Sequence, residues 1–201
     1  SIDSKSIAEI SNQVPRFVVG LGASAGGLDS LEKFFKKMPP DNGLAFVVVQ
    51  HLSPDYKSMM VELLSKHTRM KVQHAVNGSL IKPDTVYLIP PKRQLTIEEG
   101  KLFLVEQTTV SGINLPIDIF FRSLARDQES QAIAVILSGT GTDGTLGGRV
   151  VKEVGGYVLV QTPESAQFDG MPKSAIQTGI ADSILTPVSY THLTLPTSTH
   201  G

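Results

Sequence analysis

The chain has 201 residues, of which 40% are hydrophobic and 18% charged, and its formal net charge is −1. These values are typical of one globular domain with a substantial core, and the balanced charge gives no reason to expect nucleic-acid binding. The sequence contains no cysteine, which excludes disulfides, thiolate metal ligands and a cysteine nucleophile.

The start of the sequence carries no targeting signal. No apolar run approaches the ~20 residues that a membrane-spanning helix requires, and the first residues lack the basic and apolar regions of a signal peptide. We therefore expect a cytoplasmic protein without membrane insertion. Residues 1–15 are polar and weakly patterned, which predicts a linker or a disordered lead-in. Because the sequence does not begin with Met, we interpret it as a fragment or a processed form.

The folded body is predicted over residues 16–187, and it opens with a strand at Phe17–Gly20 and a helix at Leu28–Lys37. The turn between them, Gly22–Gly26, matches the pattern G-x-S-x-G, in which small neighbours permit a sharp turn that exposes the serine hydroxyl. Unpaired N–H groups at the helix start would stabilise negative charge near Ser24. A serine that caps the helix explains these residues equally well.

A second strand is predicted at Leu44–Gln50, whose continuous apolar run is typical of burial on both faces. His51 follows this strand directly. If the strand pairs with the first one, its end lies beside the Ser24 turn, where a neutral imidazole would accept the serine proton. An isolated histidine at a strand end is, however, commonly an ordinary packed or solvated residue. A helix is predicted next, at Lys57–Ser65.

The middle of the chain contains short strands at Val86–Ile89, Gln94–Ile97 and Leu102–Val105, of which the last two are predicted to form an antiparallel hairpin. Arg93 precedes this hairpin and follows a proline pair. It either lines a cleft and binds the substrate or belongs to a plain exposed turn. A helix is predicted at Pro116–Arg126.

A further buried strand, Ala132–Leu137, runs into a glycine-rich segment that contains Asp143. A helix to about Val154 and a strand at Tyr157–Gln161 follow. Asp143 is a candidate for the carboxylate that orients an imidazole and supports its charged form. The alternative is that it caps the helix that begins nearby.

The alternation of strands and helices predicts an α/β protein: a three-layer, doubly wound, mostly parallel sheet of Rossmann-like type with an inserted antiparallel hairpin. Ligands of such sheets bind at the carboxyl ends of the strands, and Ser24, His51 and Asp143 all fall at such ends. Residues 188–201 are rich in Thr and Ser without a period, which predicts a disordered or non-native tail.

Two enzyme classes and a metal site fit the sequence poorly. Gly20-x-Gly22-x-x-Ala25 matches a dinucleotide fingerprint, but Gln50-His51 stands where that fold places the acid that binds ribose. An α/β-hydrolase needs its histidine after the acid, where only the unpatterned tail supplies one. No pair of histidines and a carboxylate has metal-ligand spacing, so we expect no metal and no cofactor.

The chain resembles the catalytic domain of CheB-type protein-glutamate methylesterases from about Phe17 to Thr186. The motifs that carry the resemblance, in chain order, are Gly22–Gly27, Gln50-His51, Leu115–Asp118, Leu137–Gly144 and Phe168–Pro172. The resemblance implies that Ser24 is the nucleophile, His51 the base and Asp143 the acid. It also implies that backbone N–H groups at Ala25 and Thr140 hold the oxyanion. Ala25 replaces a frequent Thr and Thr140 a frequent Met, but both positions would act through the backbone.

The function implied by this resemblance is hydrolysis of glutamate γ-methyl esters on the cytoplasmic helices of chemoreceptors, with glutamine deamidation as a second activity. Several motifs are more similar to CheB domains fused to a CheR-type methyltransferase and sensory domains, so associated domains of these kinds are expected partners. The alternative is a catalytically silent regulatory module that only binds a partner. The presence of Ser24, His51 and Asp143 together favours the enzyme.

Overall fold

The structure, a computed structural model, describes residues 3–6, 13–50, 59–107 and 115–189. Seven strands form the main sheet, and every neighbouring pair is parallel. Their spatial order is β10 (Ser183–Leu185), β9 (Tyr157–Gln161), β8 (Ala132–Ile136), β1 (Val18–Ala23), β2 (Ala45–Gln50), β5 (Thr85–Leu88) and β3 (Lys71–His74).

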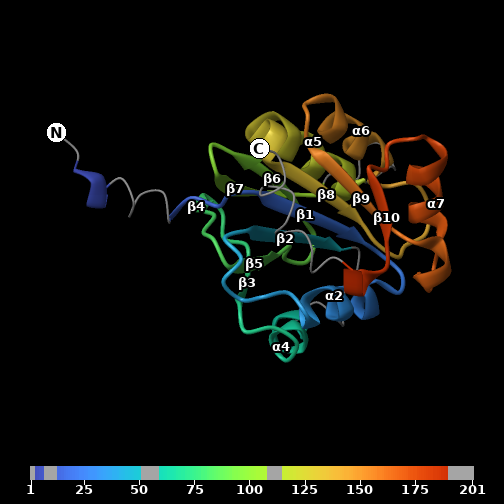
Figure 1. The fold of residues 1–201 in the computed structure, drawn as a ribbon, viewed down its shortest axis with the longest axis horizontal. Coiled ribbons are helices and arrows are strands. Elements are labelled where there is room, and N and C mark those ends of the chain that lie inside the picture. Colours follow the sequence, from blue (N-terminus) through green and yellow to red (C-terminus); the bar gives the residue numbers. More distant parts are fainter. Residues whose placement is uncertain (1–2, 7–12, 51–58, 108–114, 190–201) are drawn as a thin grey trace.

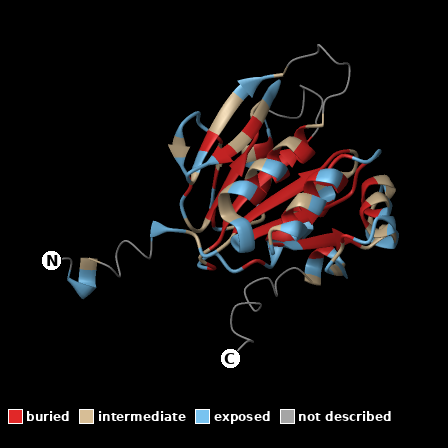
Figure 2. Ribbon diagram, turned by 90° about the horizontal axis from the view of Figure 1, so that it is seen from above, coloured by how far each residue is buried: buried red, intermediate tan, exposed pale blue. Residues whose placement is uncertain are grey.

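Helices cover both faces of this sheet, as Figure 1 shows. One face packs against α2 (Gly27–Lys36) and α4 (Met60–Ser65). The opposite face packs against α5 (Pro116–Gln128), α6 (Thr145–Glu153) and α7 (Gly170–Gln177). The short 3-10 helices are η1 (Glu129–Gln131) and η2 (Pro163–Ser165). The predicted three-layer, mostly parallel α/β fold is therefore confirmed, with the central strands buried between the helical layers (Figure 2).

A smaller antiparallel sheet contains the predicted hairpin. Its order is β4 (Ser79–Leu80), β7 (Lys101–Glu106) and β6 (Arg93–Glu98). Leu95, Ile97 and Leu102 from this sheet are buried in the same cluster as the apolar side of α5. The small sheet is thus built onto the main core.

In the middle of β1, large apolar residues alternate with glycines, because the two faces of the strand meet different neighbours. Val19 and Leu21 are buried on the α2 side. On the other face, a Cβ at Gly20 would lie 3.0 Å from the Phe120 ring, and a Cβ at Gly22 would lie 2.5 Å from Ile117 Cγ2. Since glycine has no Cβ, α5 can pack directly on β1.

The chain order of the strands creates a switch point at β1. From β1 the chain passes to β2 on one side, and it later returns to β8 on the other side. The two connections leave β1 in opposite directions, and a crevice at the carboxyl ends of β1 and β8 is the usual ligand site of such a sheet. Ser24 follows β1, and residues 137–144 follow β8.

Besides the 3-10 helices η1 and η2, four described elements were not predicted from the sequence: β3, β4, β10 and α7. The strands are short, and β3 lies at the edge of the sheet with a mixed pattern of burial. The helix α7 has only 8 residues and begins with Gly-Met-Pro, which breaks the expected apolar period. In the described part of the chain, no helix is long and apolar enough to cross a membrane.

Candidate active site

Ser24 lies in the sharp turn between β1 and α2, and its exposed fraction is 8%. The turn is closed by a hydrogen bond from the Gly27 N–H to the Ser24 carbonyl, at 2.9 Å. Gly26 precedes the helix with φ 71°, a left-handed conformation that favours glycine. A Cβ there would also lie 2.8 Å from Ser138 Oγ. The glycine therefore permits both the turn and its close contact with the segment after β8.

The Ser24 side chain is held by the segments around it. The Thr140 N–H donates to Ser24 Oγ at 3.1 Å, and the hydroxyl donates to Met171 Sδ at 3.4 Å. The Ser24 N–H donates to the Ser138 carbonyl at 3.0 Å. A Cβ at Gly139 would lie 2.3 Å from both Ser24 Oγ and Met171 Sδ. The hydroxyl thus occupies space that only glycine leaves open at position 139.

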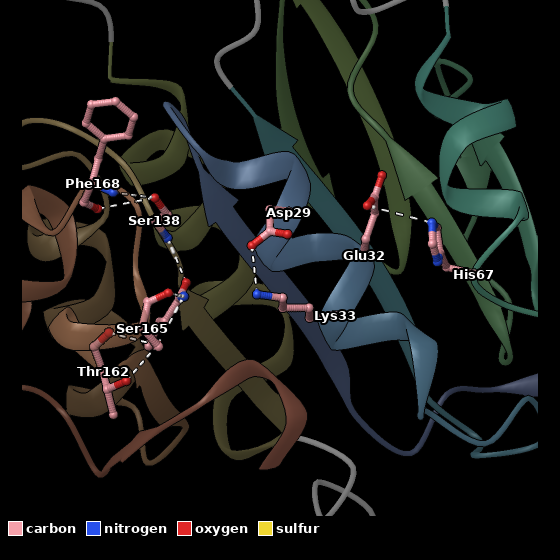
Figure 3. A network of polar contacts seen from close by, with 9 residues as sticks. Asp29, Glu32, Lys33, His67, Ser138, Thr162, Ser165 and Phe168 are labelled. Atoms are coloured by element: carbon pink, nitrogen blue, oxygen red, sulfur yellow. Dashed lines mark hydrogen bonds and ion pairs between the residues drawn. The ribbon is translucent and has the colours of Figure 1, made fainter.

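The loop that supplies the Thr140 N–H is fixed by a network centred on Ser138 (Figure 3). The Ser138 hydroxyl donates to the Ala25 carbonyl at 2.8 Å and accepts from the Phe168 N–H at 3.0 Å. The Ser138 N–H donates to Gln161 Oε1 at 3.0 Å. In addition, the Gly139 N–H donates to the Phe168 carbonyl at 3.0 Å. The turn after β1, the loop after β8 and the segment before α7 therefore form one connected unit.

Asp143 is buried at the start of α6 and faces the start of α5. Its two carboxylate oxygens accept hydrogen bonds from the N–H groups of Ile117, at 3.0 Å, and Asp118, at 2.8 Å. The carboxylate therefore caps α5, a helix adjacent to its own loop, and compensates the positive end of that helix. This capping role is compatible with a catalytic one, since a carboxylate has more than two acceptor positions.

Asp118 is a second buried carboxylate beside Asp143. Its Oδ1 accepts from the N–H groups of Gly144, at 3.0 Å, and Gly147, at 2.7 Å. Burial raises the pKa of Asp118 above its ordinary value of 3.8, and the negative charge of Asp143 raises it further. The N–H donors and Arg122 lower the pKa but do not cancel the rise. The sequence contained Asp118 within a motif, but no local signal distinguished its role.

Gln50 ends β2, as predicted, but the sequence did not reveal the state of its side chain. It is 5% exposed, and among the described residues neither side-chain amide atom has a hydrogen-bond partner. Its Nε2 lies 3.0 Å from the position of a Cβ on Gly27, so the amide sits against the first turn of α2. Buried amides without partners are uncommon, and they mark places where a ligand, an ion or water completes the hydrogen bonding.

Two further site residues were predicted from the sequence, His51 and Arg93. His51 lies outside the described residues. Arg93 begins β6 in the small sheet, and its guanidinium is 3.8 Å from the Glu106 carboxylate, its cross-strand neighbour. In the segments that the structure describes, no group of three or more histidines and carboxylates is placed to hold a metal ion.

The fold and the Ser24 turn together define a doubly wound α/β protein with a serine hydroxyl at its switch point. The family model for CheB methylesterase matches residues 19–192. The crystal structure of the Thermotoga maritima CheB methylesterase catalytic domain superposes with a TM-score of 0.82 at 32% identity, covering 90% of this chain and 98% of that chain. The chain therefore belongs to the CheB methylesterase family, as the sequence motifs predicted.

Relatives known by sequence agree with this assignment. A protein-glutamate methylesterase/protein-glutamine glutaminase of Rhizobium meliloti is 34% identical over 174 residues, which cover 86% of this chain and 49% of the relative. An uncharacterised 104.1 kDa protein of Rhodobacter capsulatus is 46% identical over 126 residues, which cover 63% of this chain and 13% of that protein. The chain thus spans about half the length of the curated methylesterases it matches.

Proposed function

We propose that this chain is a serine methylesterase that hydrolyses glutamate γ-methyl esters on the cytoplasmic helices of chemoreceptors. Ser24 is the nucleophile, His51 the general base and Asp143 the acid that orients the imidazole. The observation that carries the proposal is the position of Ser24 Oγ at the switch point, 3.1 Å from the Thr140 backbone N–H. The names of the methylesterase relatives support the choice of substrate.

In the first half of the reaction, the Ser24 oxygen attacks the ester carbonyl carbon while His51 takes the hydroxyl proton. The hydroxyl must first turn away from Met171 Sδ, which accepts its hydrogen bond in the free protein. The backbone N–H groups of Ala25 and Thr140 hold the oxyanion, and the start of α2 adds a favourable dipole. The imidazolium then returns its proton to the departing methoxy group, and methanol leaves an acyl-enzyme.

In the second half, His51 takes a proton from water as the water oxygen attacks the acyl carbon. The tetrahedral intermediate collapses, Ser24 recovers its proton, and the glutamate carboxylate is released. A glutamine side chain would follow the same course with ammonia as the leaving group, so receptor deamidation is the second activity that we propose for this site. Arg93 is retained in this proposal as a substrate-binding residue, through its positive charge at the start of β6.

Partners in the same polypeptide or assembly also belong to the proposal. The Rhodobacter relative has a mass of 104.1 kDa, against 21.6 kDa for this chain, so related domains occur within much larger proteins. We expect associated methyltransferase and sensory domains of the kinds that the sequence motifs suggested. Control of access to Ser24 would then come from such domains.

The test is release of methanol from receptor-containing membranes that carry radiolabelled methyl groups. We expect Ser24→Ala to lower turnover by roughly 10⁴ to 10⁶. Ser65→Ala is the matched control, since Ser65 is an exposed serine at the end of α4 and should leave turnover unchanged. Near-normal methanol release by Ser24→Ala would remove Ser24 from the mechanism. Receptor binding by the folded chain without ester loss would instead favour the silent module.

A further inference from the structure

Phe168 is an exposed aromatic residue whose backbone is fixed at the edge of the candidate site. The residue is 40% exposed, and in the described part of the chain it belongs to neither hydrophobic cluster. Its N–H donates to Ser138 Oγ at 3.0 Å, and its carbonyl accepts from the Gly139 N–H at 3.0 Å. Figure 3 shows the ring directed away from Ser138. The backbone is therefore anchored while the apolar side chain stays largely outside the core.

The anchoring connects Phe168 to the nucleophile itself. The Met171 N–H donates to the Gly139 carbonyl at 2.9 Å, and its sulfur accepts the Ser24 hydroxyl at 3.4 Å. The Ser138 carbonyl accepts the Ser24 N–H at 3.0 Å. Ser138, which accepts the Phe168 N–H, therefore contacts Ser24 directly. Met171, which is bonded to Gly139, contacts it as well. The Phe168 backbone consequently has a set position relative to the serine.

Exposed apolar side chains are common, so exposure alone carries no argument. Tyr157 provides the comparison, because it is 38% exposed at the amino end of β9, where no site residue has been placed. Gln161, at the other end of the same strand, joins the network that holds Ser138. What distinguishes Phe168 is that its backbone is hydrogen-bonded to Ser138 and Gly139, which lie against Ser24.

We propose that Phe168 is a substrate-docking residue that packs against apolar side chains flanking the modified glutamate on the receptor helix. This inference rests on the proposed function. A helical substrate presents residues three and four positions away on the same face as the target side chain, about 5–6 Å from it. When a methyl-ester side chain reaches Ser24, that face of the receptor helix would lie over the segment that contains Phe168. The Phe168 ring would then displace water from the apolar side chains of the helix and pack against them. Aromatic rings commonly anchor such contacts.

The experiment compares wild type, Phe168→Ala, Phe168→Leu and Tyr157→Ala with two readouts. The first is methanol release from methylated receptor membranes over a range of receptor concentrations. The second is the rate at which a small fluorophosphonate probe labels Ser24, which requires the nucleophile but no docking surface. Thermal melting checks the fold of each variant. If Phe168→Ala does not fold, Phe168→Gln, which is closer in volume, replaces it.

We expect Phe168→Ala to lower kcat/KM for the receptor about tenfold, equivalent to about 1.4 kcal/mol, through a higher KM. Probe labelling should stay within about twofold of wild type, since the site is intact. Phe168→Leu should recover most of the loss, and Tyr157→Ala should match wild type.

Three outcomes would overturn the inference. An unchanged receptor KM in Phe168→Ala, with an active wild type, removes the docking role alone. Slow probe labelling of Phe168→Ala assigns the residue to the support of the nucleophile instead of the substrate. A wild type that labels with the probe but releases no methanol from the receptor overturns the proposed function, and the docking role falls with it.

Discussion

Asp118 and Asp143 show how two identical side chains acquire different surroundings. The Asp143 carboxylate accepts hydrogen bonds from two backbone N–H groups at the start of α5, where Asp118 lies. The Asp118 carboxylate accepts two from the start of α6, which Asp143 closely precedes. The reciprocal caps fix the beginning of α5 against the beginning of α6, and hence the loop between β8 and α6. Because Asp143 lies close to the buried Asp118, its negative charge adds to the effect of burial and raises the pKa of Asp118. The protonation of Asp118 therefore bears on the geometry of the loop, because its carboxylate accepts the Gly144 and Gly147 N–H groups.

This arrangement predicts a pH dependence of stability. The native pKa of Asp118 is raised above 3.8, so its contribution to stability is fully present below that value and is lost as pH rises through the native pKa. Asp118→Asn removes the charge and keeps an oxygen that accepts the Gly144 and Gly147 N–H groups. The stability of the variant relative to wild type should therefore increase as pH rises above 3.8 and through the native pKa of Asp118.

Urea unfolding at several pH values measures this difference. Asp29→Asn serves as the control for loss of one negative charge, because Asp29 is exposed on α2 and pairs with Lys33. If wild type and Asp118→Asn lose stability in parallel across the range, the buried carboxylate does not titrate as described.

The residue scale also shows what a single sequence can specify. The pattern around Ser24 predicted its turn, and the position of Thr140 beside it followed from the family resemblance. The contact of Ser24 with Met171 could not be predicted, because the two residues are 147 positions apart. Nothing local marks a thioether that lies against a hydroxyl. The pairing of Asp118 with Asp143 was hidden for the same reason.

At the scale of elements, the glycines of β1 have a packing role. The sequence allowed Gly20 and Gly22 to belong to a nucleotide-binding fingerprint. In the structure both face α5: a Cβ at Gly22 would clash with Ile117, and a Cβ at Gly20 would be tightly packed against Phe120. The close approach brings the start of α5, and with it Ile117, to the end of β1. The glycines thus help to place the start of α5, which Asp143 caps, beside the end of β1.

A double-mutant cycle tests this contact. Gly22→Ala would place a Cβ 2.5 Å from Ile117 Cγ2, and we expect it to cost about 1–3 kcal/mol of unfolding free energy through overpacking. Ile117→Ala removes the clashing atoms and alone should cost about 2–5 kcal/mol. The double variant should lose less unfolding free energy than the sum of the two single losses, by about 1 kcal/mol or more. Additive costs in urea unfolding would show that the two positions do not compete for space.

Long, buried elements were predictable, and short ones were not. Strands β1, β2, β8 and β9 are apolar runs, and α2 has a clear apolar face, so pattern alone identified them. In β3 only Val72 is fully buried, and its neighbours along the strand are polar. Such a strand is stabilised by its pairing with β5, which no local pattern encodes. Tertiary contacts decide the structure of such segments.

At the scale of the whole molecule, the small sheet and the main sheet share one core. Leu95 and Leu102 are fully buried in the cluster that contains Phe120 and Phe121 of α5. The other face of the hairpin carries Val105, which is 53% exposed. The sequence predicted the hairpin as an insertion. It did not show that the hairpin covers part of the core, because that packing depends on α5 lying between the two sheets. We therefore expect the sheets to unfold together.

Leu95→Ala tests this expectation, with Val105→Ala as a matched control from the same sheet. Loss of the Leu95 side chain should cost about 2–5 kcal/mol and shift the whole unfolding transition, because the cavity opens in the shared core. Val105→Ala should cost less than about 0.5 kcal/mol, since most of its side chain already contacts water. Urea unfolding followed by far-UV circular dichroism and by tyrosine fluorescence measures both. Separate midpoints for the two signals in Leu95→Ala would mean that the small sheet unfolds independently, and that α5 does not join the sheets into one cooperative unit.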